Sequence, residues 1–572
     1  MAERALLASV LLLAGCFPSG AGVDPPTDRT VYFPVGLALD GDARHLYIAN
    51  SDFDLQYNAG TLENWDLDAL RARLPVSCAS DADCGDGQLC DTASPPEHAH
   101  NAVPSGWCVA NVGTPDAPKA GTPCPDSRET TPAERELYPG RCASLNPQSN
   151  AGGAPIHLSS VQIGAFATDL VYRARPTPDD AGHTGRLFLP VRGDATLHWI
   201  DVTAVADDGS ASPLLDCGQT EPGADGACAA DHRRGNDAGA ENTRGLTMLP
   251  EPFGIDADDT GDWIMITNQS SSATGLFQNL WGSGSGFDNG PSYQYTVAGL
   301  SGQPMGVAAV PRALAAVALG QPDLPEFLVS LRGSTQLDLL RVYPDSGSNP
   351  PRPYAKAPDS TIIVANANGG DSRGMAIDAL ERQTEERRCA TRHGVSVECA
   401  TSKSNCPDDA DPAYAAYVTC VQQAATVPLG VFVTNRDPAS LLVGQTRAVI
   451  ADLASYDVPI FQNTVPLDLG PARVVTGEIT NLSGEREPRA FALSFDSRRV
   501  LIYDIARGQA EGEIITGRGP QAIAVDGAHA LAYVAHFIDS YIGVVDLDQR
   551  HTATYGVMIA MIERPVAPRA SK

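Results

Sequence analysis

The residues with the most evident chemistry in this 572-residue chain are its thirteen cysteines. Cysteine thiolates either bind zinc or pair as disulfides. Cys16 stands alone near the N-terminus, and the other twelve are an even number with no C-x₂-C spacing, the spacing typical of zinc sites. We therefore expect six disulfides, with metal binding as the disfavoured alternative. The twelve residues form three groups: Cys78, Cys84, Cys90, Cys108, Cys124 and Cys142; Cys217 and Cys228; and Cys389, Cys399, Cys406 and Cys420.

The N-terminal sequence predicts export. Residues 5–14 form an apolar run, ALLASVLLLA, which is too short to be a permanent membrane span and is typical of a secretory signal. The run ends in LAGC at Cys16, which resembles the bacterial lipobox, and this resemblance implies that Cys16 is acylated and becomes the mature N-terminus. Phe17 follows Cys16 where retention at the inner membrane would favour Asp, so the resemblance implies a lipid anchor in the outer membrane, on either its periplasmic or its surface side. An ordinary signal peptide is the alternative, and export in either form favours disulfides.

An acidic turn offers the other candidate metal ligands. Residues 256–262 read DADDTGD, which resembles the start of a calcium-binding loop, D-x-D-x-x-G. The twelfth position is Thr267 where such a loop has a bidentate glutamate. We therefore interpret the segment as a solvated turn and expect neither a metal site nor a cofactor, with calcium as the alternative.

Composition and motifs exclude several function classes. The eleven histidines are scattered, and the sequence has no C-x-x-C-H haem attachment, no G-x-S-x-G nucleophile and no phosphate-binding loop. We therefore assign no catalytic residue. The net charge of −29 repels the phosphate backbone, so nucleic acid is not an expected partner.

Repeated strand-like segments must position these residues. The last complete repeat, Gly519–Leu547, has two apolar alternations joined by Asp526-Gly527, the pattern of a β-hairpin, and a third run that ends near Asp546. A repeat of about forty residues with three or four strands predicts a β-propeller. Segments similar to its LAYVAH run recur at residues 46–50, 187–191, 263–268, 327–331, 431–435, 491–495 and 531–536.

The order of motifs in each repeat, G-x-P…DG…YVAN…VIDL in outline, resembles the bacterial YVTN or YncE-like propeller family. The resemblance covers residues 31–563 and implies an all-β, seven-bladed propeller of four-stranded antiparallel blades. The run TYGVMIAMI at residues 554–562 has no blade left after it, and the first blade near Val35 lacks a strand before its Pro and Gly. We expect these two to pair and close the ring, which would remove an open sheet edge.

Extra chain separates the repeats. Residues 71–155 are rich in Cys, Pro and Gly, residues 205–247 are acidic, and residues 383–425 hold the last cysteines around a helical pattern, PAYAAYVTCVQQA. If the LAYVAH-like runs are third strands, all three insertions leave the sheets on one face, because antiparallel neighbours alternate in direction. We expect one decorated face and one plain face.

The first insertion resembles small extracellular Cys-rich modules of the form C…DC…G…C…C. That resemblance implies the pairs Cys78–Cys90 and Cys84–Cys108. Such modules often present a surface to another protein, and an inert, protease-resistant loop is the equally weighted alternative.

These observations predict a membrane-anchored, monomeric propeller. We expect a non-enzymatic binding or scaffold module for a protein or a cell-envelope polymer, which contacts the membrane through its lipid anchor only. The alternative is a hydrolase, such as a lactonase with a divalent metal in the central tunnel, as the family resemblance allows. The predicted segments are a signal peptide (1–15), a tether (16–30), the propeller (31–563) with its Cys-rich insertion (76–155) and second Cys-containing insertion (383–425), and a tail (564–572).

Overall fold

The structure is a computed structural model of the chain. Cys16 and the predicted signal peptide lie outside the described residues. The structure describes residues 23–566 except 28, 79, 93–105, 115–116, 123, 125–126, 151–152, 178, 180–181, 204–213, 220–225, 236–245, 283–288, 321–323, 345, 348–351, 358–361, 364–369, 397–398, 400–405, 408–410, 451–454 and 553.

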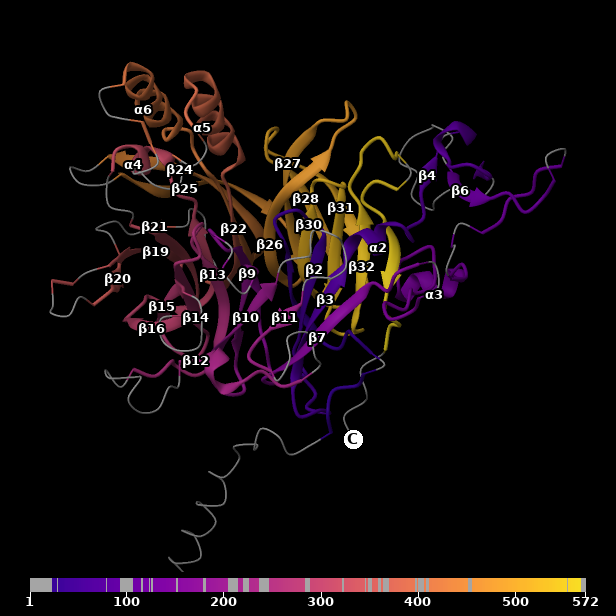
Figure 1. The fold of residues 1–572 in the computed structure, drawn as a ribbon, viewed down its shortest axis with the longest axis horizontal. Coiled ribbons are helices and arrows are strands. Elements are labelled where there is room, and N and C mark those ends of the chain that lie inside the picture. The colour runs from indigo at the N-terminus through magenta and orange to yellow at the C-terminus, as the bar shows by residue number, and fades with distance from the viewer. Residues whose placement is uncertain are drawn as a thin grey trace, which may run out of the picture.

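Antiparallel sheets dominate the described chain (Figure 1). Seven sheets in the described ranges have four or five strands each, and they follow one another along the sequence. The strands of the first four are β1 (Pro34–Leu39), β2 (His45–Asn50), β3 (Gly60–Asp66) and β7 (His157–Ile163); β8 (Val171–Ala174), β9 (His183–Val191), β10 (Thr196–Thr203), β11 (Leu215–Asp216) and β12 (Arg233–Arg234); β13 (Pro252–Ala257), β14 (Trp263–Asn268), β15 (Ala273–Trp281) and β16 (Asn289–Ala298); and β17 (Gln303–Val310), β18 (Glu326–Arg332), β19 (Gln336–Tyr343), β20 (Tyr354–Lys356) and β21 (Ile362–Ile363).

The last three sheets continue the same order to residue 562. Their strands are β22 (Ser372–Asp378), β23 (Gly430–Arg436), β24 (Ala439–Ile450) and β25 (Ser455–Pro466); β26 (Pro471–Thr480), β27 (Arg486–Ser494), β28 (Arg499–Asp504) and β29 (Gln509–Ile515); and β30 (Pro520–Asp526), β31 (Leu531–His536), β32 (Tyr541–Asp546) and β33 (Met558–Ile562). A small sheet in the first insertion contains β4 (Ser77–Cys78), β5 (Gln88–Asp91) and β6 (Gly106–Ala110).

The helices lie in the connections. They are α2 (Leu67–Arg71), η1 (Asp81–Asp83), α3 (Pro132–Leu137), η2 (Ala230–His232), α4 (Leu314–Ala318), α5 (Leu380–His393) and α6 (Pro412–Ala424). The helical pattern predicted in the second Cys-containing insertion is α6, which Asp411 caps by accepting a hydrogen bond from the backbone N–H of Ala413. Among the described helices, none is both long and apolar enough to cross a membrane.

The first strands of successive sheets form a ring. β1 contacts β8, β8 contacts β13, and the series continues through β17, β22 and β26 to β30, which contacts β1. Sheets arranged in a closed ring around an axis are the architecture of a β-propeller. The predicted all-β propeller is therefore the observed fold.

The LAYVAH-like runs are the second strands of their sheets, and our assignment of them as third strands was wrong. In the last repeat, β30 pairs with β31, and β31 pairs with β32. The hairpin predicted around Asp526-Gly527 is thus made of strands one and two. The error arose because the fourth strands lack the alternating apolar pattern, as β29 (QAEGEII) illustrates.

The insertions consequently occupy other connections than we expected. Residues 76–155 lie between β3 and β7, the third and fourth strands of the first sheet, and residues 383–425 lie between β22 and β23, the first and second strands of the fifth. These two types of connection leave antiparallel sheets at the same end. We call this end the insertion face, and we call the opposite end, which carries short turns such as 269–272 and 537–540, the mouth face.

The fourth strand is interrupted in two sheets, which therefore have five strands and not four. β11 and β12 both pair with β10, and β20 and β21 both pair with β19. In each case two short segments together occupy the outer edge.

Ring closure differs from our expectation. β33 pairs with β32 as the fourth strand of the last sheet, and all four strands of the first sheet come from the N-terminal part of the chain. The first sheet needs no strand from the C-terminal part of the chain, because the segment around Val35 is itself its first strand, β1. The C-terminal edge is covered by the first insertion, where Leu145 N–H donates to the Met561 carbonyl at 2.9 Å and Glu563 N–H donates to the Leu145 carbonyl at 2.8 Å.

The first insertion also contributes to the core. Trp107 and Val109 are buried in the same apolar cluster as Trp65 of the first sheet and Ile559 of the last. Burial of apolar side chains is the main driving force of folding. The insertion is therefore attached to the junction between the first and last sheets and is not a free module.

Candidate functional site

All twelve grouped cysteines are paired in the structure. The pairs are Cys78–Cys90, Cys84–Cys108, Cys124–Cys142, Cys217–Cys228, Cys389–Cys420 and Cys399–Cys406. The first two have the connectivity that the resemblance to Cys-rich modules implies. The Sγ atoms of Cys78, Cys84 and Cys108 lie within 4.8 Å of one another, but all three are disulfide-bonded and are not thiolates that could hold an ion.

The acidic turn at residues 256–262 spreads its carboxylates over separate partners. Asp256 contacts the Arg173 guanidinium at 2.8 Å. Asp258 accepts a hydrogen bond from the backbone N–H of Trp263 at 3.0 Å, and Asp259 accepts one from that of Arg312 at 2.7 Å. Carboxylates held by different groups do not converge as calcium ligands do.

A cavity of about 400 Å³ lies at the axis of the ring. The first strands, or the residues just before them, contribute to its lining from all seven sheets, through Leu37, Leu170, Ile255, Val307, Met375, Val474 and Ile523. Phe253, Arg436 and Phe495 also line it, and they place the cavity toward the mouth face.

The two carboxylates in this axial cavity are already bound by arginines. Asp169 accepts a hydrogen bond from Arg473 Nη1 at 2.7 Å, and Asp256 contacts Arg173. Burial raises the pKa of Asp169, and the Arg473 guanidinium opposes this shift. The described lining contains no Glu, Asn or His. It therefore does not offer the converging, unpaired oxygen ligands that a divalent ion requires.

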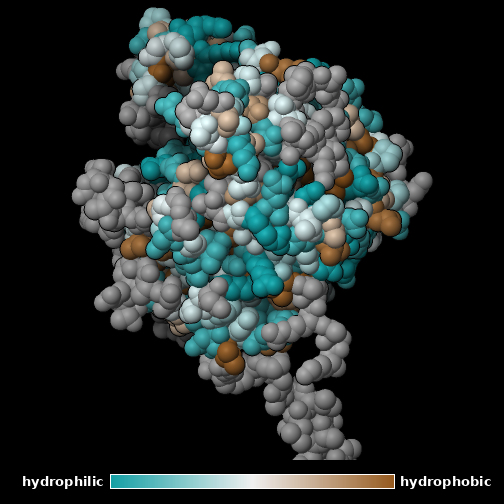
Figure 2. All heavy atoms as spheres, turned by 90° about the vertical axis from the view of Figure 1, so that its right-hand side faces the viewer, coloured by the Kyte–Doolittle hydropathy of each residue, from teal (hydrophilic) through white to brown (hydrophobic). Residues whose placement is uncertain are grey.

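A larger recess lies between the first insertion and the last two sheets. We call it the insertion groove; its volume is about 600 Å³. Figure 2 faces this side of the molecule, whose surface is mainly hydrophilic with scattered apolar residues. The insertion groove is lined by Trp107, Arg135, Glu136, Pro139, Gly140 and Arg141 of the insertion, by Ser497, Arg498, Arg499, Glu513, Ile515 and Thr516 of the sixth sheet, and by Gly556, Val557 and Met558 of the seventh.

Positive charge exceeds negative charge in the insertion groove. Four arginines line it against two glutamates, although the whole chain carries a net charge of −29. Arg499 forms an ion pair with Glu513, and Arg141 contacts Glu129 at 3.2 Å, whereas Arg498 has no salt-bridge partner among the described residues. The indole N–H of Trp107 is also without a hydrogen-bond partner in the described part of the chain. The Arg498 guanidinium is thus the group that the groove offers to an anion, whereas the Trp107 indole is buried in the core.

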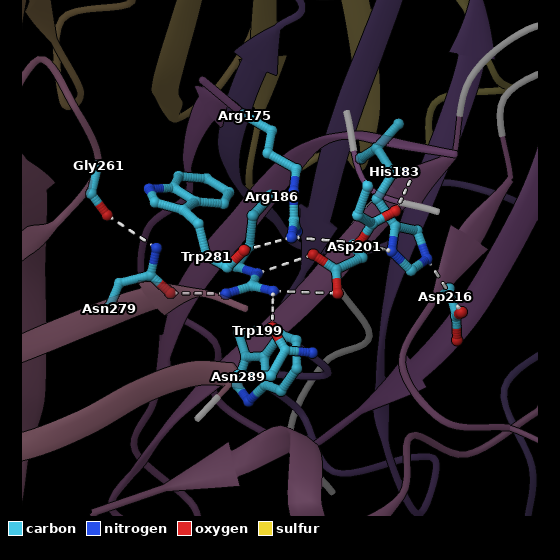
Figure 3. A network of polar contacts seen from close by, with 12 residues as sticks. Arg175, His183, Arg186, Trp199, Asp201, Asp216, Gly261, Asn279, Trp281 and Asn289 are labelled. Atoms are coloured by element: carbon cyan, nitrogen blue, oxygen red, sulfur yellow. Dashed lines mark hydrogen bonds and ion pairs between the residues drawn. The ribbon is translucent and has the colours of Figure 1, made fainter. Parts of the chain in front are cut away.

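A buried polar network joins the second and third sheets (Figure 3). The Arg186 guanidinium is fully buried between Asp201, at 2.7 Å, and the side-chain oxygens of Asn279 and Asn289, at 2.7 and 2.8 Å. Its carbon lies 4.3 Å from the centre of the Trp199 ring. These contacts occupy the guanidinium on all sides, so we assign the network to stability and not to binding.

At the edge of this network, His183 makes stability depend on pH. Its ring lies between Asp179, at 2.9 Å, and Asp216, at 3.4 Å, and the hydrogen bond to Asp216 is the largest factor that raises the pKa of His183 to about 9. In the unfolded chain this pKa is about 6.5. The protonated form therefore stabilises the fold fully below pH 6.5, and this contribution is lost as the pH rises through 9.

We expect the free energy of unfolding to fall by about 1–3 kcal/mol between pH 6.5 and 9, and His183→Gln to remove most of this slope. Urea denaturation of both proteins at several pH values measures it. The same slope in the variant would contradict the assignment to His183.

Sequence reasoning singled out none of the groove residues. Arg498 ends the turn before β28 and Arg499 is the first residue of that strand, whereas Arg135 and Arg141 lie more than 350 positions earlier, within and just after α3. The two segments meet only because the insertion covers the edge of the last sheet. The single local signal is the basic pair at positions 498–499, which is unremarkable by itself.

Comparisons with known proteins assign no family to the chain. No protein-family model and no curated protein matches the chain. Among solved structures, similarity is found to a proposed 6-phosphogluconolactonase of Bacteroides fragilis (12% identity, 75% of this chain and 95% of that chain, TM-score 0.41). It is also found to a periplasmic gluconolactonase of Pseudomonas aeruginosa (11%, 69% and 96%, 0.35) and to virginiamycin B lyase of Staphylococcus aureus (8%, 88% and 92%, 0.33). Similarity this low assigns no activity to the chain, and the ring of sheets is what defines it as a β-propeller protein.

Proposed function

We propose that this protein is a lipid-anchored, seven-bladed propeller that binds an anionic group of a protein or cell-envelope polymer in the insertion groove, without catalysis. The observation that carries the proposal is the excess of arginines in a groove that the insertion and the propeller build together. A guanidinium recognises carboxylates and phosphates through paired hydrogen bonds. A propeller without residues 76–155 would lack this groove, because the insertion forms one of its sides.

The rest of the proposed organisation follows the sequence. Each of the seven antiparallel sheets is one blade, Cys16 carries the lipid after removal of residues 1–15, and the mature protein is a monomer in the outer membrane. Residues 16–30 are the tether, and residues 564–572 form a tail. The paired cysteines suit an exported protein, because disulfides persist in oxidising compartments.

A hydrolase is the second candidate, and no observation favours it over binding. The axial cavity is the place where a propeller hydrolase would hold its metal, yet Asp169 and Asp256 both contact arginines there. Turnover of glucono-δ-lactone that depends on a divalent ion, and that Asp169→Asn abolishes, would replace our proposal with this one.

The charge-reversing substitution Arg498→Glu tests the groove. We expect it to reduce the recovery of a specific partner from envelope extract at least tenfold, because it changes the local charge by two units at the guanidinium without a salt-bridge partner. Arg507→Glu is the matched control, since Arg507 is 65% exposed in the turn between β28 and β29 and does not line the groove. Equal recovery by the two variants would contradict a role for the groove.

A further inference from the structure

We propose that the mouth face docks on the phospholipid bilayer that holds Cys16, with Phe53, Leu55 and Leu469 in the boundary between headgroups and acyl chains. The inference rests on the lipid anchor of the proposed function and goes beyond it, because a lipidated tether alone would leave the propeller free to tumble. Its principal residues, Phe53, Leu55 and Leu469, do not line the insertion groove, which opens beside the mouth face where Arg498 and Ile515 lie.

Both ends of the described chain leave at the mouth face. The Val23 carbonyl accepts a hydrogen bond from Asn58 N–H at 2.9 Å in the turn between β2 and β3, and Val566 N–H donates to the Asp539 carbonyl at 2.9 Å in the turn between β31 and β32. Cys16 precedes Val23 by seven residues. A fully extended chain of that length spans about 24 Å, so an acylated Cys16 keeps this face close to the bilayer.

Exposed apolar side chains gather on the same face. They belong to the first, sixth and seventh sheets and the turns beside them, which are neighbours in the ring. Apolar side chains exposed together on one surface mark a site of contact with a protein or a membrane. Their exposed fractions are 68% for Val23, 51% for Phe53, 41% for Leu55, 74% for Leu469, 47% for Ile515 and 41% for Val566.

A platform of phenylalanine rings supports the most prominent of these side chains. The Phe53 ring lies 5.2 Å from that of Phe537, 6.0 Å from that of Phe166 and 6.2 Å from that of Phe33, measured between ring centres. The three partner rings come from the segment before β1, the connection between β7 and β8, and the turn between β31 and β32. Phe53 is thus held in a fixed position at the surface, where insertion into lipid costs little side-chain entropy.

Several charges on the mouth face are paired within the protein, with Arg498 in the turn between β27 and β28 as an exception. Arg436 contacts Asp496 at 2.7 Å, with both side chains nearly half exposed, and Arg518 forms an ion pair with Asp539. Paired charges give no strong attraction to anionic headgroups. The surface therefore fits a zwitterionic phospholipid, bound through apolar contact.

This orientation would turn the insertion face away from the membrane. Helices α5 and α6 and the strands β4 and β6 lie toward the top of Figure 1, whereas Val23 and Val566 are hydrogen-bonded to turns of the mouth face. A partner that binds the insertions would then reach them without displacing lipid.

Tryptophan quenching tests the docking in the full-length lipidated protein. We would reconstitute the Phe53→Trp and Leu482→Trp variants in phosphatidylcholine vesicles that contain brominated acyl chains. Leu482 is the matched control because it is a 70% exposed leucine in a turn on the insertion face. Four of the five native tryptophans, Trp65, Trp107, Trp199 and Trp263, are 8% exposed or less, and the half-buried Trp281 is present in both variants and gives each the same background.

We expect brominated lipid to quench the added tryptophan fluorescence at least threefold more in Phe53→Trp than in Leu482→Trp. Equal quenching, or a blue-shifted but unquenched Trp at position 53 as contact with a second copy would give, would overturn the docking. Failure of the protein to float with vesicles would overturn the anchor and the docking together. Partner recovery with Arg498→Glu is measured in envelope extract without vesicles, so its result is read separately from the docking.

Discussion

A chain that ends at Gln549 is expected to lose its cooperative unfolding transition. The truncation removes β33, whose residues Met558–Ile562 are 5% exposed or less. Burial of the four large apolar side chains in this strand is worth about 6–12 kcal/mol, at roughly 1.5–3 kcal/mol for each. That sum is comparable with the entire stability of a typical protein, about 5–15 kcal/mol.

Loss of β33 also opens two other surfaces. It exposes the backbone edge of β32 from Tyr541 to Asp546, and an unpaired edge promotes aggregation. It further removes the hydrogen-bond partners of Leu145 and the carboxylate of Glu563, which accepts a hydrogen bond from Thr30 N–H at 3.1 Å. The first insertion and the N-terminal segment would both lose their attachment to the last sheet.

Thermal unfolding followed by near-ultraviolet circular dichroism measures the effect of this truncation. A chain that ends at Val566 is the control, because it lacks residues 567–572 but keeps β33 and Glu563. It should melt as the full-length chain does. An unchanged melting curve for the chain that ends at Gln549 would refute the contribution of β33.

The repeat pattern predicted the architecture because the second strands carry a strong signal. Their side chains are buried on both faces of the sheet, as in LAYVAH at Leu531–His536, where all six residues are buried. The Asn that ends several of these strands has a shared structural use: the side-chain N–H of Asn50 donates to the Thr30 carbonyl, and that of Asn268 donates to the Leu249 carbonyl, each just before a first strand. Burial and hydrogen bonding that recur at the same position of each repeat can be recognised in the sequence.

The order of strands within a sheet was harder to predict, because the sequence of an edge strand is less constrained by burial. β29 is half exposed and polar, β11 and β12 have two residues each, and β33 is separated from β32 by eleven residues. A fourth strand only needs to complete one edge, so its sequence need not alternate. This is why the run at residues 554–562 was assigned to the wrong sheet.

The candidate groove could not be predicted at all, because it depends on contacts between segments far apart in the chain. Trp107 enters the same core cluster as Ile559, more than 450 positions later, and only this packing brings Arg135 and Arg141 near Arg498 and Arg499. Charge counts revealed an acidic protein and gave no hint of a locally basic recess. The cysteine groups indicated which segments contain disulfides, but not where those segments pack on the propeller.

The second large effect is expected for Arg186→Met, which should lower the free energy of unfolding by about 3–5 kcal/mol. The substitution keeps much of the side-chain volume beside Trp199 but leaves Asp201 buried without its cation, at 2% exposure. The side-chain oxygens of Asn279 and Asn289 would lose donors at the same time. Urea denaturation followed by tryptophan fluorescence measures the loss.

A double substitution separates the cost of the orphaned charge from the value of the ion pair itself. Replacing both partners, as Arg186→Met with Asp201→Asn, removes the uncompensated charge and should recover at least half of the lost stability. Arg388→Met is the exposed control; its guanidinium pairs with Glu385 on the surface of α5, and surface pairs contribute about 0–1 kcal/mol. If the double variant were no more stable than Arg186→Met alone, the cost would lie in lost packing and amide contacts between the second and third sheets, and the buried charge of Asp201 would not be its source.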